Sequence, residues 1–309
     1  MKLVTYKVHI EAAPRLGVIR DGLVLDVEGF GAEIGLMLPD RMLDFIDLGP
    51  YAVHQLSSAL GAAGGDWGNA LALPLETVTL MAPIPRPRKN IFGIGLNYLD
   101  HVTESAKALD TSPDLPQQPV VFSKPPTAVV GPGDPVRHDG NMTQQLDWEV
   151  ELAVIIGTRA QRVARDKALA HVFGYSVIVD VSARDNRRAG QWIFSKGMDS
   201  YAPFGPCIVT ADEIPDPQSL DLWLTINGVE KQRSNTAKML FKVDELIADL
   251  STGITLEPGD IIASGTPEGV GAGRDPQEWM WPGDVMEAHV EGIGSLRNPI
   301  VDARETGTG

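Results

Sequence analysis

The chain has 309 residues, of which 43% are hydrophobic and 22% charged, a composition typical of a globular protein with a substantial core. Its formal net charge of −15 opposes contact with nucleic-acid phosphates and anionic membranes, so we expect neither as a partner. A single cysteine excludes an intrachain disulfide, and no apolar run reaches the roughly 18 residues of a membrane span or resembles a signal peptide. These features predict a cytoplasmic protein.

The N-terminal part of the chain predicts a small α+β domain over residues 1–80. Alternating hydrophobic residues indicate short strands at 3–10, 15–20 and 22–27. Apolar residues at helical spacing indicate helices at 42–48 and 51–60. Pro83, Pro85 and Pro87 then rule out a helix or a central strand, so 81–89 is predicted to be a stiff connector. A second, larger domain is predicted to cover the remaining residues, 90–309.

Hydrophobic runs of strand length dominate this second part. They lie at 90–94, 120–123, 148–156, 175–181, 207–210, 220–226, 261–264 and 285–290. Helical patterns are confined to 100–109, 166–171 and 243–250. Pro-Gly-Asp tripeptides starting at Pro132, Pro258 and Pro282 place Pro and Gly where a type II turn requires them. The pattern predicts a mixed α/β, β-rich fold, a partly closed roll with peripheral helices.

Three acidic residues in two predicted strands form a candidate metal site. Glu149 and Glu151 are two residues apart, so they point to the same face of a strand. Asp180 ends the apolar run of another strand, at the edge of the predicted core. Three carboxylates without sulfur or imidazole ligands suit Mg²⁺ or Mn²⁺, and such a cation would offset their repulsion. Taken alone, the glutamate pair fits equally well a strand whose polar face lies in water.

Two glycine-containing segments carry further candidates. Gly93-Ile-Gly95 begins like a dinucleotide-binding fingerprint, but Tyr98 occupies the position of the required third glycine. His101 and Glu104 lie three apart on a predicted helix, which fits a general base with its orienting carboxylate or an ordinary surface pair. Gly265-Thr266 opens a segment that either lets a ligand approach the backbone or forms a tight loop.

These segments form an ordered series of motifs between about residues 90 and 300. The series includes Gly95-Leu-Asn-Tyr98, His101-x-x-Glu104, Phe122-Ser-Lys-Pro125, Trp148-Glu-Val-Glu-Leu152, Asp180-Val-Ser-Ala-Arg-Asp185, Leu256-Glu-Pro-Gly-Asp260 and Gly265-Thr-Pro-Glu-Gly269. In this order and chemistry they resemble the fumarylacetoacetate hydrolase family. The resemblance implies a β-sandwich roll, a homodimer, and metal ligation by Glu149, Glu151 and Asp180.

The resemblance also implies roles for other side chains. It makes His101 and Glu104 a catalytic dyad on a lid and Lys196 a catalytic lysine. Where many members carry a substrate-contacting glutamine, this chain has Arg187, followed by Arg188. The two arginines either bind a second carboxylate of the substrate or are solvated surface charges. The residues expected to contact substrate are Tyr98, Arg184, Arg187, Gln191, Gly265 and Thr266.

The implied activity is divalent-metal-dependent hydrolysis of a C–C bond in an acylpyruvate or 2,4-dioxo acid. His101 would deprotonate water for attack on the remote carbonyl, and Lys196 and the cation would stabilise the departing pyruvate enolate. Oxaloacetate decarboxylation and isomerisation of a 2-oxo acid use the same groups and remain alternatives. Each of these reactions implies a small anionic 2-oxo acid as the partner. A non-catalytic metal-binding protein is disfavoured because the dyad, the lysine and the three carboxylates are all present.

Overall fold

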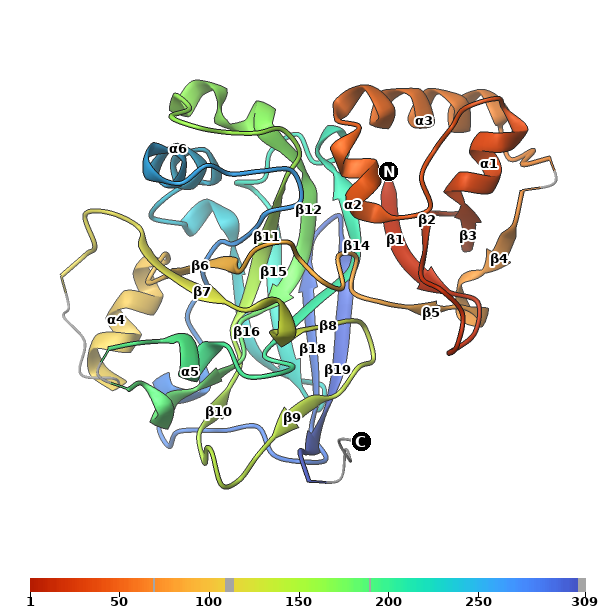
Figure 1. Cartoon of the computed structure of the whole chain (residues 1–309). Helices are drawn as coiled ribbons and strands as arrows, with labels where there is room; N and C mark the ends of the chain where they lie inside the picture. The colour runs from red at the N-terminus through yellow and green to blue at the C-terminus, as the bar shows by residue number, and fades with distance from the viewer. Residues whose placement is uncertain (69, 109–113, 189, 305–309) are drawn as a thin grey trace.

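The computed structural model describes residues 1–68, 70–108, 114–188 and 190–304. A twelve-stranded sheet runs through the molecule (Figure 1). Its strands are β1 (Lys2–Lys7), β2 (Arg15–Arg20), β3 (Leu23–Asp26), β4 (Ala72–Pro74), β5 (Thr79–Leu80), β6 (Ile91–Gly95), β7 (Val120–Lys124), β8 (Val129–Val130), β11 (Val150–Ile156), β12 (Val172–Val179), β14 (Ala202–Thr210) and β17 (Ile261–Ala263). Their main order is β4-β3-β2-β1-β14-β12-β11-β17-β6-β7, with β5 on β1 and β8 on β14.

A second sheet of five strands has the order β16-β15-β18-β19-β9. It consists of β9 (Val136–His138), β15 (Asp221–Ile226), β16 (Val229–Asn235), β18 (Val285–Val290) and β19 (Gly294–Asp302). A two-stranded ladder joins β10 (Leu146–Asp147) to β13 (Ser182–Ala183). The helices are α1 (Val27–Glu33), α2 (Met42–Asp47), α3 (Pro50–Ala63), α4 (Leu99–Ala108), α5 (Ile193–Lys196) and α6 (Val243–Gly253). The β-rich mixed fold predicted from the sequence is therefore confirmed.

The two faces of β11 belong to different hydrophobic cores, as the two-residue period of a strand requires. Leu152 and Val154 pack in the core shared with the five-stranded sheet and α6. Ala153 and Ile155 pack in the core shared with α1, α2 and α3. Glu149 and Glu151 lie on the same side of the strand as Ala153 and Ile155, because these four residues follow one another at two-residue spacing. All seven residues of β11 are buried, and so is Glu149 immediately before the strand, so a face open to water is excluded and both carboxylates lie in the interior of the protein.

The N-terminal residues extend the large sheet. Strand β1 pairs with β14 through Lys2↔Val209 and Leu3↔Ile208, so hydrogen bonding is continuous between the two parts of the chain. Figure 1 shows the N-terminal strands and α1–α3 gathered at one end of this sheet, away from α4 and α5. The boundaries 1–80, 81–89 and 90–309 remain a prediction about folding units.

Most predicted elements have counterparts in the structure. The strands expected at 15–20 and 285–290 match β2 and β18, and the glycines of the three Pro-Gly-Asp turns have the positive φ angles of a type II turn, between 80° and 101°. The segment 166–171 lies in a 3-10 helix, Arg165–His171, instead of an α-helix. Position 109, the predicted end of a helix, lies outside the described residues. Helices α1 and α5 and strands β16 and β19 are among the elements that the sequence did not predict. No helix among the described residues is long and apolar enough to cross a membrane.

Candidate active site

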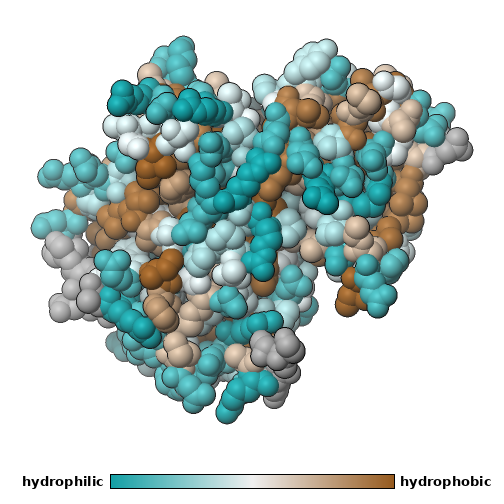
Figure 2. Space-filling model, viewed as in Figure 1, coloured by the Kyte–Doolittle hydropathy of each residue, from teal (hydrophilic) through white to brown (hydrophobic). Residues whose placement is uncertain are grey.

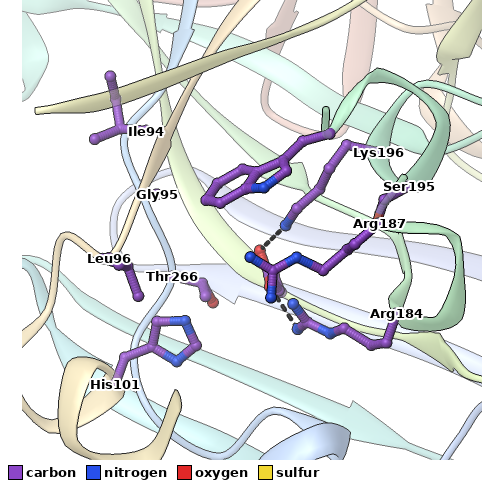
Figure 3. Close-up of a pocket in the computed structure, with 11 residues that line it drawn as sticks. Ile94, Gly95, Leu96, His101, Arg184, Arg187, Ser195, Lys196 and Thr266 are labelled. Atoms are coloured by element: carbon purple, nitrogen blue, oxygen red, sulfur yellow. Dashed lines mark hydrogen bonds and ion pairs between the residues drawn. The ribbon is translucent and has the colours of Figure 1, made fainter. Parts of the chain in front are cut away.

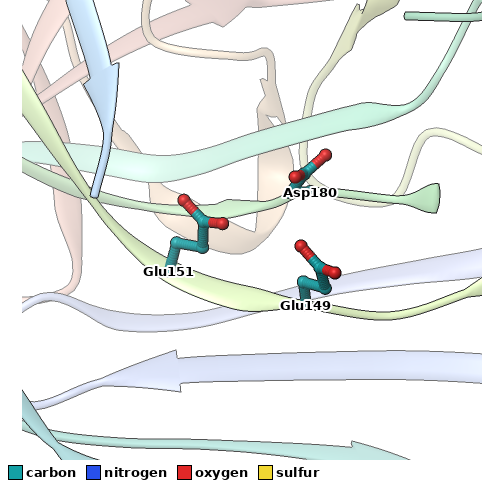
Figure 4. Close-up of side chains that lie close together, drawn as sticks. All are labelled: Glu149, Glu151 and Asp180. Atoms are coloured by element: carbon teal, nitrogen blue, oxygen red, sulfur yellow. The ribbon is translucent and has the colours of Figure 1, made fainter. Parts of the chain in front are cut away.

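Three carboxylates meet in the interior beside the ends of β11 and β12. Glu149 and Glu151 come from one strand segment, and Asp180 follows the neighbouring β12 directly. One oxygen from each lies within 4.8 Å of the others, and all three side chains are buried (Figure 4). Three hard oxygen donors that converge in this way fit a divalent cation that keeps further positions for water or a ligand.

Two buried lysines neutralise part of this cluster. The Lys196 ammonium lies 2.7 Å from Glu149 Oε2 and 2.6 Å from Asp180 Oδ2. Burial by itself would lower the pKa of Lys196, but the two carboxylates outweigh it and hold the pKa above its ordinary value. Lys124 approaches Asp180 from the other side, with Nζ 2.5 Å from Oδ1. Because Lys124 is completely buried, desolvation is the main reason that its pKa is lowered.

A buried arginine connects the cluster to a structural aspartate. Arg184 donates from Nη2 to Glu149 Oε1 at 2.5 Å and from Nε to Asp147 Oδ2 at 2.8 Å. Asp147 also accepts the backbone N–H groups of Gly271 and Ala272 at 2.6 and 3.0 Å. Burial opposes the charge on Glu149, but Lys196 and Arg184 overcome it and hold its pKa far below the ordinary value. Glu149 is therefore ionised, and its ion pairs with Lys196 and Arg184 hold its carboxylate in one orientation.

Glu151 has a different environment from the other two carboxylates. Its described partner is the backbone N–H of Gly265, 2.9 Å from Oε2, and no lysine or arginine of the described residues forms an ion pair with it. Burial, Asp180 and Glu149 together raise its pKa well above the ordinary value. A divalent cation would offset the repulsion and the desolvation that disfavour a charged Glu151. This buried carboxylate without an ion pair among the described residues is the observation that best supports a metal site here. Gly265 has a φ of 101°, and a Cβ there would lie 2.6 Å from Asn97 Cβ.

A cavity of about 40 Å³ opens beside Glu149 (Figure 3). This is room for a few water molecules. Figure 2 shows apolar residues gathered over β6 and β7, the strands on this side of the molecule. The residues that line the cavity are Ile94, Gly95, Leu96, His101, Glu149, Arg184, Arg187, Trp192, Ser195, Lys196 and Thr266.

His101 faces the cavity from α4, opposite the arginines in Figure 3. Its Nδ1 lies 3.4 Å from Glu104 Oε2, which is long for a hydrogen bond between these groups. Glu104 is held in turn by the N–H of Gly269, 3.1 Å from each carboxylate oxygen. The helix therefore brings the dyad to the site, as the three-residue spacing predicts, and anchors it to the glycine-rich segment.

Three of the residues predicted to bind substrate are placed elsewhere. Tyr98 is fully buried outside the cavity lining, and burial together with Glu151 raises its pKa well above the ordinary value. Gln191 is exposed at the surface. Gly265 uses its amide to hold Glu151, so its described contact is with a carboxylate of the cluster. Thr266 lines the cavity, but its hydroxyl donates to Val150 O and accepts from Gln232 Nε2.

The remaining predicted residues are brought together: His101, Lys196, Arg184, Arg187 and the three carboxylates. Their roles in catalysis stay predictions. Site positions for Asp147, Trp192, Ser195 and Gln232 were not predicted from the sequence. Lys124 was marked only by its place in the motif Phe122-Ser-Lys-Pro125, because a sequence does not reveal which lysines are buried.

Comparison with known proteins gives this fold and site a family. The model for the fumarylacetoacetate (FAA) hydrolase C-terminal domain matches residues 90–301. The chain therefore belongs to the fumarylacetoacetate hydrolase family. Fumarylacetoacetate hydrolase from Exiguobacterium antarcticum superimposes with a TM-score of 0.79 at 36% identity, covering 98% of this chain and 99% of that one. Maleylpyruvate hydrolase from Sphingobium, solved with manganese(II) and pyruvate, gives 0.77 at 30% identity, with 98% and 99% covered.

Curated relatives narrow the class of reaction. Oxaloacetate tautomerase fahd2 of Xenopus laevis, a mitochondrial protein, is 37% identical over 306 residues, 97% of this chain and 90% of the relative. Oxaloacetate tautomerase YisK of Bacillus subtilis is 43% identical over 227 residues, 73% of this chain and 74% of the relative. The prediction of a metal-dependent enzyme of this family is confirmed. For the reaction itself, these relatives support the isomerase alternative better than the hydrolase predicted first.

Proposed function

We propose that this enzyme interconverts the enol and keto forms of oxaloacetate or a closely related 2-oxo acid. The observation that carries the proposal is the small cavity in which His101 faces Lys196 and the buried carboxylates. The tautomerase names of relatives at 37% and 43% identity support it. The reaction moves one proton between the C2 oxygen and C3, breaks no C–C bond and needs no attacking water.

The residues of this chain fit such a proton transfer. An imidazole exchanges protons readily near neutral pH, so His101 would take the C3 proton in one direction and return it in the other. Glu104 would hold the ring in position, as its contacts with His101 and Gly269 indicate. Lys196 has three N–H donors and uses two on Glu149 and Asp180, so one can stabilise negative charge on the substrate oxygen.

The three carboxylates would hold Mg²⁺ or Mn²⁺, as the manganese in the maleylpyruvate hydrolase structure also suggests for this chain. When bound, the cation would polarise the 2-oxo group and make the C3 proton more acidic. Burial of the cluster strengthens every such electrostatic interaction because little water is present to screen it.

Hydrolysis of an acylpyruvate is the second candidate, supported by the similarity to maleylpyruvate hydrolase. The hydrolysis requires space for an attacking water and for the acyl group, in addition to the space for the pyruvate portion of the substrate. A homodimer also remains a prediction, which light scattering would confirm by a mass twice that of the chain.

The test is a rapid-mixing assay of enol oxaloacetate, followed by ultraviolet absorbance and by coupling the keto form to malate dehydrogenase. Parallel reactions would measure decarboxylation of oxaloacetate and cleavage of acetylpyruvate and fumarylpyruvate. We expect tautomerisation above the metal-only blank, and its loss with EDTA. His101→Ala should lower the rate by about 10²–10⁴-fold. The matched control His54→Ala removes an exposed histidine from α3 and should change nothing. Cleavage of a dioxo acid without tautomerisation would replace the proposal with hydrolysis.

A further inference from the structure

Arg187 differs from the other cations that line the cavity. Arg184 and Lys196 each contact two buried carboxylates. Among the described residues Arg187 has no carboxylate within ion-pair distance, and its described contact is with an aromatic ring. Its guanidinium lies 5.1 Å from the centre of the Trp192 ring. Of the arginine and lysine side chains that line the cavity, Arg187 is therefore the one whose charge can pair with a bound ligand.

Packing holds this guanidinium at the cavity. The Trp192 ring that supports it lies 5.3 Å from the Phe122 ring. Gly95 gives the indole the space to do so, because a Cβ at that position would lie 2.7 Å from the Trp192 ring. A guanidinium that lies over an aromatic ring keeps N–H groups available for bidentate hydrogen bonds to a carboxylate. The contact with Trp192 thus holds Arg187 beside the cavity, where it can bind an anion.

The surroundings of Arg187 also favour an anion. Burial and the positive charge of Arg184 lower the pKa of Arg187, yet a guanidinium stays protonated in proteins. A partly desolvated cation beside a second one gains most when a negative group replaces the lost water. In Figure 3 both arginines extend toward the cavity from the same side. The charge of Arg184 is already paired with Asp147 and Glu149, whereas Arg187 forms no ion pair among the described residues, so a further anion is best placed at Arg187.

We propose that Arg187 binds the distal carboxylate of a 2-oxo dicarboxylic acid and selects such substrates over monocarboxylic ones. The inference rests on the proposed function and narrows its substrate class. The ion pairs of the site agree with it. Arg184 and Lys196 are each paired with two carboxylates, whereas Arg187 forms no ion pair with a carboxylate of the described residues.

The adjacent arginine provides an internal comparison. Arg188 is exposed, does not line the cavity, and lies with its guanidinium 3.7 Å from the centre of the Phe194 ring. The sequence offers two adjacent arginines as equal candidates for a second carboxylate. The backbone turn between them sends Arg187 to the cavity and Arg188 to the surface. Arg188→Gln is therefore a matched control that removes the same charge one residue away.

Binding of acids that cannot react tests the assignment without turnover. 2-Hydroxysuccinate and 2-hydroxybutanoate differ by a distal carboxylate in place of a methyl group. Calorimetry in saturating Mn²⁺ should show that Arg187→Gln weakens 2-hydroxysuccinate by about 10- to 100-fold, the range for a hydrogen-bonded charge. Its effect on 2-hydroxybutanoate should stay within about 3-fold, and Arg188→Gln should leave both affinities unchanged. Equal weakening of both acids by Arg187→Gln, or of neither, would overturn the proposal.

Kinetics give a second readout on oxaloacetate and the isosteric 2-oxobutanoate. Arg187→Gln should raise KM for oxaloacetate by a similar factor while kcat changes only a few-fold, because the distal carboxylate does not react. The preference for oxaloacetate over 2-oxobutanoate should largely disappear. If no tautomerisation occurs but the binding difference is present, the proposed reaction fails and the dicarboxylate site stands. If tautomerisation occurs with no change in preference, the site fails and the reaction stands.

Discussion

Replacing Lys124 with methionine removes a completely buried positive charge from behind the carboxylate cluster. The ammonium forms an ion pair with Asp180 at 2.5 Å and donates to the carbonyl oxygens of Val181, Lys196 and Tyr201. Methionine fills nearly the same volume but satisfies none of these groups. Removing one partner of a buried ion pair costs about 3–5 kcal/mol. A typical protein unfolds with about 5–15 kcal/mol, so the variant should fold but be much less stable.

Urea unfolding followed by circular dichroism measures this loss, first without metal and then with Mn²⁺. Without metal, Lys124→Met should lose about 3–5 kcal/mol of unfolding free energy. Because the site then has one more uncompensated negative charge, Mn²⁺ should bind the variant more tightly and restore more stability than it adds to the parent protein. Lys167→Met, which changes an exposed lysine, should stay within about 0.5 kcal/mol. A Lys124→Met protein within about 1 kcal/mol of the parent would refute the structural role of the buried pair.

Three other perturbations follow from the same contacts. Glu151→Gln should weaken Mn²⁺ binding, measured by calorimetry, by more than the roughly 10–100-fold typical of an outer-shell change, with the fold retained in circular dichroism. Burial opposes ionisation of Asp26, but the hydrogen bonds that its carboxylate accepts from Arg15, Gly29 and Tyr6 outweigh this effect and lower its pKa. The ionised Asp26 therefore stabilises the fold at pH values above the ordinary carboxyl pKa, and this stabilisation is lost as the pH falls through the lowered pKa. Asp26→Asn should therefore cost about 2 kcal/mol at pH 7 in urea unfolding and progressively less below about pH 4. Gly174→Ala would place a Cβ 2.3 Å from Val209 O and should lower the melting temperature, at a cost of about 1–3 kcal/mol, whereas Gly61→Ala meets open space on α3 and should raise it slightly.

The local period of the backbone is what made the carboxylate site predictable. Side chains two apart on a strand share a face, so Glu149 and Glu151 had to point together once the apolar run after them was assigned to a strand. The same argument applies to His101 and Glu104, which share one side of a helix. These relations depend only on neighbouring residues, and tertiary packing did not alter them.

Burial was less predictable because it depends on what covers an element. The glutamate pair alone was compatible with a strand face in water, yet β11 is buried on both sides by segments distant in the chain. Strands β16 and β19 were missed for a related reason. The sequence of β16, Val-Glu-Lys-Gln-Arg-Ser-Asn, has almost no hydrophobic alternation, and pairing with β15 supplies its order. Long-range pairing therefore decides the structure where the local pattern is weak.

The sequence by itself determined the family motifs, the hard-oxygen donor set and the residues able to move protons, since these are properties of residue type and short spacing. Only the tertiary structure decided that Lys124 lies beneath Asp180, that Tyr98 is sealed in the core, and that Arg187 rather than Arg188 reaches the cavity. The physical reason is that a charge acquires its function from its environment. Desolvation and the nearest opposite charge set its energy, and both are created by residues brought together from distant parts of the chain.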